Sequence, residues 1–389
     1  MKNFFTRFWF FVGIIMVIII AFAFPFIGQK AKEWRLLDIG IFIAFLITGL
    51  KLETSSMVRE VKNIKGISAA LVSTFIIFPG LALVLAQLFF KSTVDFTVGS
   101  CIIAVAPVTV ASGIVMTTLA NGNVPLSLFI CVASNLLSIF TIPISLDLVL
   151  KFDQSINLPV WKMMQSLVMI VLVPTLAGQL LRIKVKEKIA PYNKAFSIFS
   201  QGIVLLIIFN AVSSSTSKIT AAGAAIIYVL LFMIFLHSLI LSFNFGIARL
   251  IKLNRSSTAA FTIQTSQKTL TVSYIVWAGY FATGFPLAMI PAIGYHLTQM
   301  VMDTLVAQWF RKKTDNRGRM TEDRRPKTED GRTEKSPSLK NNSPPLVKGG
   351  PGGIILYSFN SVFKSPVEVS RRDKEAENGK SRTEKTVNL

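Results

Sequence analysis

The sequence predicts an all-α integral membrane protein with ten transmembrane helices. Of its 389 residues, 52% are hydrophobic, and the mean hydropathy is +0.56. The apolar residues form long runs separated by short charged clusters, a pattern typical of membrane proteins. A helix of about 20 residues crosses the roughly 30 Å of bilayer hydrocarbon. Runs near this length lie at residues 7–27, 36–51, 67–90, 96–119, 124–149, 160–181, 194–214, 220–249, 257–281 and 284–310.

The distribution of basic residues predicts the orientation. With the N-terminus inside, 17 lysines and arginines fall in inner segments and 7 in outer loops before residue 314. This bias, together with an even number of spans, predicts a multi-pass protein of the cell (inner, cytoplasmic) membrane with both termini in the cytoplasm. Lys30, Lys32 and Arg35 fall in a predicted outer loop and oppose the bias. The net charge of +21 therefore indicates basic loops rather than nucleic-acid binding.

The composition changes after residue 313. Residues 314–389 carry 16 basic and 11 acidic side chains among many Ser, Pro and Gly residues. Such a segment cannot bury enough apolar surface to offset its ordering entropy, so we expect a disordered basic cytoplasmic tail.

Short internal matches predict a repeat within the membrane part. The segment "FPFIGQ" (24–29) resembles "VPTLAGQ" (173–179), and "GIFIAFLITGL" (40–50) resembles "GIVLLIIFNAV" (202–212). Residues 1–155 and 156–313 then form two repeats of five helices each. Because five is odd, the second repeat enters the membrane from the opposite side and is inverted.

The fourth span of each half is interrupted. Pro107 lies mid-span and is followed by Thr109 and Ser112; proline removes a backbone donor, so the helix is expected to break there. The stretch "TIQTSQKTLTVS" (262–273) is polar on every helical face. Such backbone at membrane depth must be enclosed by protein or line a cavity. We expect the two segments to meet and to form a binding site.

Three segments carry a family resemblance: "APVTVASGIVMTTLANGNVPLSLFICVASNLLSIFTIPI" (106–144), "TSQKTL" (265–270) and "IPAIGYHLTQ" (290–299). They resemble the SBF-like branch of the bile acid:sodium symporter superfamily, and the resemblance covers about residues 5–313. It implies ten helices in two inverted repeats, arranged as panel and core domains with two crossed discontinuous helices. It also implies secondary active transport of organic anions, bile-acid-like or carboxylate solutes, by alternating access.

In sodium-coupled members of that superfamily, the resemblance implies cation ligands on the third, fourth, fifth and ninth helices. Here the fourth-helix Ser-Asn pair falls on Gly113 and Ile114, and the ninth-helix Glu falls on Ile263 when Gln267 matches the Gln. Lys268 takes the next position, and its positive charge argues against sodium. The residues that remain as possible sodium ligands are Gln87, Ser134 and Gln267. The other candidate substrate- or ion-binding residues are Thr109, Ser112, Asn135, Gln264, Thr265, Ser266, Lys268, His296 and Gln299.

A lysine in mid-span costs about 3 kcal/mol on insertion scales and indicates function. Lys268 is a built-in cation replacing sodium, a proton carrier, an anchor for an anionic substrate, or a structural lysine bound to helix C-terminal carbonyls. His237 has no polar cluster near it in the sequence and is interpreted as a packing histidine whose polar atoms are satisfied. His296 either packs or contacts substrate or proton, and Asp303 either pairs with Lys268 or lies near the cytoplasmic interface.

The sequence does not favour an enzyme. It contains no HExxH, Gly-x-Ser-x-Gly or P-loop motif, and Cys101 and Cys131 fall inside predicted spans as packing residues. We expect no cofactor, with sodium or a proton as the coupling ion. The expected partners are the lipid bilayer and a small organic anion, without nucleic acid. The alternative function is a membrane sensor or scaffold that binds a small ligand without net transport.

Overall fold

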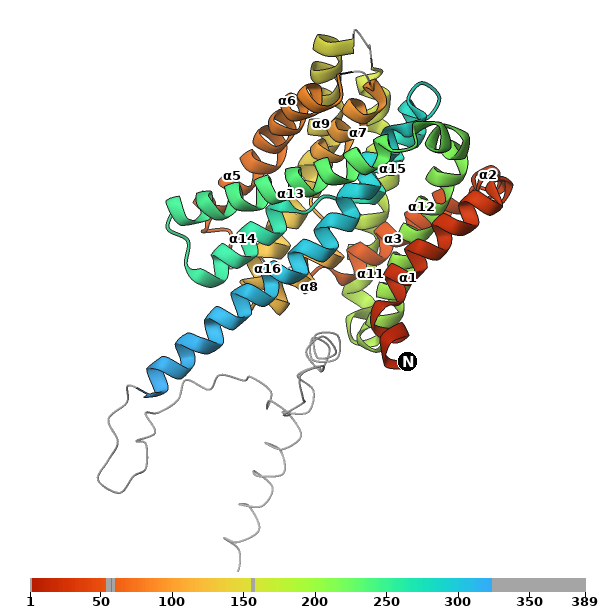
Figure 1. Ribbon diagram of the computed structural model, residues 1–389. Helices are drawn as coiled ribbons and strands as arrows, with labels where there is room; N and C mark the ends of the chain where they lie inside the picture. The colour runs from red at the N-terminus through yellow and green to blue at the C-terminus, as the bar shows by residue number, and fades with distance from the viewer. Residues whose placement is uncertain (1, 54–56, 58–59, 92, 155–157, 324–389) are drawn as a thin grey trace, which may run out of the picture.

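A computed structural model describes residues 2–53, 57, 60–91, 93–154 and 158–323, and every regular element among them is a helix (Figure 1). The prediction of an all-α membrane protein is therefore confirmed. The helices long and apolar enough to cross a bilayer within this part of the chain are Ile64–Phe89, Val124–Leu150, Val160–Ile189, Asn193–Ala222 and Ala225–Leu250. Two shorter apolar helices are Trp9–Ala23 and Val94–Val105. The remaining predicted spans are shorter, interrupted or more polar.

The helices form two groups, and each packs mainly within itself. The first group contains α1 (Lys2–Ala23), α2 (Pro25–Glu33), α3 (Leu36–Lys51), α10 (Val160–Leu167), the π-turn η3 (Val168–Leu172), α11 (Val173–Ile189), η4 (Ala190–Tyr192) and α12 (Asn193–Ala222). The second contains α5 (Ile64–Val72), the π-turn η2 (Ser73–Ile77), α6 (Phe78–Phe89), α7 (Val94–Val105), α8 (Ala111–Leu119), α9 (Val124–Gln154), α13 (Ala225–Leu250), α14 (Arg255–Ser266), α15 (Leu270–Val276), η5 (Trp277–Phe281), η6 (Pro286–Ala288) and α16 (Met289–Asp323).

Glycines allow close helix pairs in the first group. Helices α1 and α2 pack against α12, and α3 packs against α11 (Figure 1). A Cβ atom on Gly28 would lie 2.4 Å from the Ser213 side chain, and one on Gly178 would lie 2.1 Å from the Leu46 carbonyl oxygen. Small residues bring helix backbones together where lipid provides no hydrophobic drive for association.

Two prolines each follow a π-turn. Pro79 has no N–H, so a regular helix would leave the carbonyl four residues earlier without its donor. The chain instead forms a wider turn, in which the Phe78 N–H donates to the Ser73 oxygen. The same arrangement precedes Pro174, where the Val173 N–H donates to the Val168 oxygen.

Both predicted helix interruptions are present. Helix α7 ends at Val105 because Ala106, which precedes Pro107, is extended with φ −60° and ψ 151°. The chain becomes helical again at Ala111. The second interruption separates α14 from α15, where Gln267 is extended with φ −83° and ψ 148°.

Helix α16 continues past the predicted end of the membrane part to Asp323. Residues 314–323, which were predicted to belong to a disordered tail, are therefore helical. Adding residues to an existing helix costs much less than nucleating a new one, so a polar sequence can prolong α16. The remaining part of the predicted tail, 324–389, lies outside the described residues.

Candidate functional site

The two helix interruptions meet inside the second helix group. The Thr269 N–H donates to the Pro107 carbonyl over 3.0 Å, which joins one unwound segment to the other. We call the unwound segments 106–110 and 267–269 together the crossing. Most of the residues in it are buried, as enclosure of irregular backbone at membrane depth requires.

Lys268 is fully buried at the crossing and binds two carbonyl oxygens. Its Nζ donates to the Ala106 oxygen and to the Thr74 oxygen, both over 2.9 Å. The ammonium also lies 4.7 Å from the centre of the Phe78 ring, within the range of a cation–π contact. Lys268 therefore connects the crossing to the π-turn η2.

Proline leaves both of these carbonyl oxygens open. The Thr74 oxygen would accept from the Phe78 N–H in an α-helix, but that N–H bonds Ser73 instead. Its π-helical donor would be residue 79, and Pro79 has no N–H. Ala106 is the C-cap of α7, just before Pro107. One ammonium thus satisfies two carbonyls that the helices cannot satisfy themselves.

In each unwound segment, side chains bond both the backbone N–H and the backbone carbonyl of one residue. Gln299 of α16 accepts from the Lys268 N–H over 2.8 Å and donates to the Lys268 carbonyl over 2.9 Å. The same amide nitrogen lies 3.0 Å from His296 Nδ1, so His296 accepts. On the other segment, Ser134 Oγ accepts from the Val108 N–H over 3.4 Å, and Asn135 donates to the Val108 carbonyl over 3.3 Å.

Gln267 connects the crossing to a buried acidic group. Its Oε1 accepts from Thr109 Oγ1 over 2.7 Å and from Ser112 Oγ over 2.8 Å, and its Nε2 donates to Asp303 Oδ2 over 2.7 Å. Asp303 Oδ1 lies 3.0 Å from Nε2 of His237. Asp303 therefore approaches the crossing from α16, although the ninth-span position expected to carry an acid is Ile263.

His237 is buried within a polar cluster that the sequence did not reveal. Its Nδ1 lies 2.8 Å from the Tyr295 hydroxyl, and this hydroxyl donates to the Ser266 carbonyl over 2.6 Å. His237 is on α13, whereas Tyr295 and Asp303 are on α16. The sequence showed no polar cluster around His237 because its partners belong to another helix. The only available signal was the presence of two ionisable residues and a tyrosine within apolar spans.

The remaining predicted residues of the ninth span are also buried and bonded. Gln264 donates to the Thr109 carbonyl over 2.7 Å and accepts from Ser127 Oγ over 2.7 Å. Ser266 Oγ accepts from Asn244 Nδ2 over 2.9 Å, and Thr265 donates to the Phe261 carbonyl. These bonds fix α14 against its neighbours rather than leaving the side chains free for a solute.

The candidate sodium ligands are not all brought together. Gln87 lies nine residues beyond Phe78 on α6, about 13 Å along the helix axis, whereas the Phe78 ring lies under Lys268. Ser134 bonds Val108, and Gln267 bonds the adjacent residue Thr109 of the first unwound segment. Among the described residues, no group of three or more His, Cys, Asp or Glu side chains could hold a metal ion.

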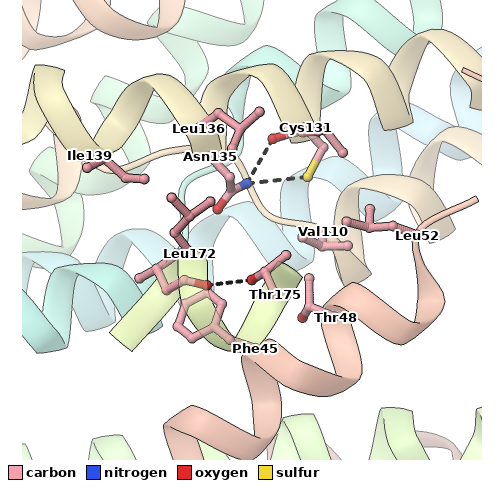
Figure 2. A pocket seen from close by; sticks show the side chains of 12 residues that line it. Phe45, Thr48, Leu52, Val110, Cys131, Asn135, Leu136, Ile139, Leu172 and Thr175 are labelled. Carbon is pink, nitrogen blue, oxygen red and sulfur yellow. Dashed lines mark hydrogen bonds between the residues drawn. The ribbon is translucent and has the colours of Figure 1, made fainter. Parts of the chain in front are cut away.

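Two cavities lie where the helix groups face each other. The first, here the Asn135 cavity, encloses about 40 Å³ of free space (Figure 2). It lies between α3, η3, α11 and α9, and Val110 connects it to the crossing. Its lining is mainly apolar, with Thr48, Asn135 and Thr175 as polar members. A largely apolar cavity with a few polar groups is typical of small-molecule sites.

The second cavity, here the Arg35 cavity, is larger, with about 470 Å³ of free space. It lies between the beginning of α3, the α10–η3 turn and α15–η5, and Glu33, Arg35 and Asp38 line its mouth. Along α3 it reaches from Leu37 to Phe42, whereas the Asn135 cavity begins at Phe45. The two cavities therefore occupy successive stretches of the same boundary.

Multiple membrane-spanning helices, two of them broken and joined beside such cavities, define a membrane transporter. Residues 8–312 match the SBF-like CPA transporter family, and the chain belongs to that family. The resemblance to the SBF-like branch of the bile acid:sodium symporters is confirmed.

Relatives with transport names cover most of the chain. It is similar to the "Probable sodium/metabolite cotransporter BASS4, chloroplastic" of Oryza sativa subsp. indica, with 27% identity over 319 residues, 78% of this chain and 75% of the relative. The protein of the same name in Arabidopsis thaliana is 29% identical over 314 residues, 76% of this chain and 71% of the relative. "Sodium/bile acid cotransporter 7-B" of Xenopus laevis is 25% identical over 312 residues, 77% and 90% of the two chains.

Proposed function

We propose that this protein is a secondary active transporter that moves small organic anions by alternating access. The observation that carries the proposal is the pair of cavities along one boundary between the helix groups. In alternating access the solute site opens to one side of the membrane and then to the other. Two cavities at successive depths along α3 are consistent with one opening on each side. The names of the relatives, which mention bile acids and metabolites, support an organic solute.

An inverted repeat supports alternating access. In the internal match, residues 46 and 50 of the first half correspond to residues 208 and 212 of the second. Gly28 packs against Phe209 and Ser213, and its counterpart Gly178 packs against Leu46 and the Leu50 N–H. The two glycines therefore meet positions that differ by one residue between the matched segments of the opposite halves. We infer two five-helix repeats with a panel, the first helix group, and a core, the second.

The peptide clamps at the crossing follow the same symmetry. Ser134 and Asn135 on the fifth predicted span hold Val108, and Gln299 on the tenth holds Lys268. The fifth and tenth spans are counterparts in the proposed repeat. Alternating access by exchange of conformation between the repeats requires such matched contacts.

We infer that Lys268 is a resident cation in place of sodium. Its ammonium binds the C-cap carbonyl of α7, where the helix dipole is negative, and the carbonyl left open before Pro79. A cation held in this way would stabilise the crossing without a transported ion. Coupling to sodium is not favoured, because a second cation nearby would be repelled.

We propose the cytoplasmic (inner) membrane as the location, with both termini in the cytoplasm. The excess of basic residues in predicted inner segments, 17 against 7, supports this orientation. The Asn135 cavity then lies toward the cytoplasm, since it reaches Leu52 near the inner end of α3. The Arg35 cavity opens toward the outside.

Solute counterflow in proteoliposomes tests the function without any assumption about the coupling ion. Labelled taurocholate and labelled succinate represent a bile acid and a small carboxylate. We expect entry of one of them to accelerate when the vesicles are preloaded with the same unlabelled solute. Absence of counterflow for a broad panel of organic anions would overturn the proposal, and binding without flux would favour a sensor.

A matched pair of substitutions tests the site. Thr48 and Thr220 each donate to the carbonyl four residues earlier, but Thr48 lines the Asn135 cavity and Thr220 is exposed on α12. Thr48→Phe should lower counterflow about tenfold, which corresponds to roughly 1.4 kcal/mol of lost binding. Thr220→Phe should leave it unchanged. Equal effects of the two substitutions would exclude the cavity as the solute site.

A further inference from the structure

A buried histidine–aspartate pair lies beside the crossing and does not hold Lys268. His237 Nε2 and Asp303 Oδ1 are 3.0 Å apart, and both side chains are 0% exposed. The pair joins α13 to α16. Charged groups are rarely placed at this depth of a membrane protein unless they serve ion movement or a specific contact.

The number of protons on this pair follows from which groups donate and which accept in its hydrogen bonds. The Tyr295 hydroxyl has one proton, and it must point to the Ser266 carbonyl, which can only accept. The hydroxyl therefore accepts from His237, so Nδ1 carries a proton. Gln267 donates to Asp303 Oδ2. A hydrogen bond between His237 Nε2 and Asp303 Oδ1 then requires one further proton, held by either atom.

Loss of that proton is incompatible with the observed arrangement. A neutral His237 that donates through Nδ1 would present the Nε2 lone pair to the carboxylate at 3.0 Å. Asp303 would become a buried anion whose one donor in this network is the Gln267 amide. An uncompensated buried charge is costly, so deprotonation favours a different arrangement of the helices.

Gln267 transmits this change to the crossing. The amide group that donates to Asp303 also accepts from Thr109, in the first interruption, and from Ser112, at the start of α8. Any shift of the Asp303 carboxylate therefore acts on the contact between the two broken helices. Because His237 and Asp303 are sealed from solvent, the proton exchanges only when these helices move.

The charged surroundings of the pair are simple. Tyr295 contacts His237 directly, and from η2 and α6 the packed groups are uncharged. Lys268 adjoins Gln267, and its ammonium points to the Thr74 and Ala106 carbonyls. Glu, Asp, Lys and Arg are absent from α8, which carries Ser112.

We propose that the His237–Asp303 pair is a proton-binding site that couples this transporter to a proton. The proposal rests on the proposed function. One proton from water joins the pair between Nε2 and Oδ1, and the net charge of the pair changes from −1 to zero. No other bond forms or breaks, and release on the opposite side of the membrane restores the charge. A monovalent anion carried with this proton would cross without net charge.

The proton can be observed directly by NMR of the histidine side chains. The chain contains two histidines, so one substitution assigns both. The ¹⁵N resonances of the imidazole rings report protonation in detergent without any solute, and His296→Gln assigns them. We expect His237 Nε2 in the wild type to change from protonated to unprotonated as pH rises. In Asp303→Asn, the new amide donates to Nε2 and preserves every hydrogen bond, so Nε2 should remain unprotonated throughout. Absence of titration in the wild type, or the same titration in Asp303→Asn, would overturn the site.

Flux measurements test the coupling. An inward proton gradient should drive accumulation of taurocholate or succinate in wild-type proteoliposomes, up to about tenfold per pH unit for one proton and one monovalent anion. Asp303→Asn mimics the protonated pair, so it should retain counterflow and lose accumulation. Asp147→Asn, the same change on α9 where Asp147 accepts from Leu158, should retain both.

The outcomes separate the two proposals. Counterflow that ignores the proton gradient, or gradient-driven accumulation that persists in Asp303→Asn, would overturn the coupling and leave transport intact. Absence of wild-type counterflow would overturn transport and its coupling together, while the imidazole titration would still decide whether the pair binds a proton.

Discussion

At the scale of single residues, the crossing consists of polar groups that each have a specific partner on another helix. Lys268 bonds the carbonyls of Thr74 and Ala106, and Gln299 holds the Lys268 peptide. In a bilayer no water replaces a lost partner, so every such group contributes to the arrangement of the helices. The polar stretch in the ninth span therefore serves contacts within the protein.

The Lys268→Met variant should be about 2 kcal/mol less stable than the wild type, because two buried carbonyls lose their donor while the apolar stem is retained. Lys218→Met, at an exposed position on α12, should change stability by about 0.5 kcal/mol at most. The free energy of unfolding in mixed detergent micelles measures both. A Lys268→Met protein as stable as Lys218→Met would show that the ammonium does not hold the crossing.

At the scale of elements, prolines and glycines determine how the helices meet. Pro79 and Pro174 each follow a π-turn, and the first of these turns presents the Thr74 carbonyl to Lys268. Gly28 and Gly178 allow helices from the two halves to touch. These residues carry no chemistry of their own, but they set the positions of those that do.

Alanine at Gly28 or Gly178 should destabilise the protein, and alanine at Gly202 should not. Gly178→Ala places a Cβ 2.1 Å from the backbone oxygen of Leu46, which cannot move without α3, so a loss of about 2 kcal/mol is expected. Gly28→Ala places a Cβ 2.4 Å from the Cβ of Ser213, which side-chain rotation cannot move, so a similar loss is expected. Gly202→Ala has no neighbour within 4 Å and is the control. Thermal unfolding of the three variants ranks them, and an equal cost at positions 178 and 202 would contradict the close contact of α3 with α11.

At the scale of the whole molecule, the boundary between the two helix groups contains both cavities. The first group supplies α3, η3 and α11, and the second supplies α9, α15 and the start of α8. Contacts within each group outweigh those between them, so relative movement of the groups breaks few interactions. The proposed orientation assigns one cavity to each side of the membrane.

Labelling of single cysteines with a membrane-impermeant maleimide tests that orientation. The native Cys101 and Cys131 are 2% and 0% exposed, so they should give little background. Lys91 lies in a predicted outer loop and Lys62 in a predicted inner one, and both are exposed. In intact cells Lys91→Cys should react, and Lys62→Cys should react after permeabilisation alone. The reverse pattern would invert the topology.

The sequence by itself determined the all-helical membrane class, the two interruptions and the family. These properties are local: apolar runs identify membrane helices, Pro107 breaks its own helix, and "TSQKTL" is a contiguous motif. The sequence also indicated that Lys268 occupies an unusual place. It did not reveal the hydrogen-bonding partners of His237, whose surroundings along the chain are apolar.

Only the tertiary structure decided the partners. Lys268 and the Thr74 carbonyl are 194 positions apart, and His237 is 66 positions from Asp303. Nothing in the composition around either residue specifies the other, because hydrogen bonds between helices depend on how the helices are packed and rotated. The prolonged α16 was likewise set by continuation of a packed helix rather than by its polar end. Where a buried charge or proton is held is thus a property of the packed helices.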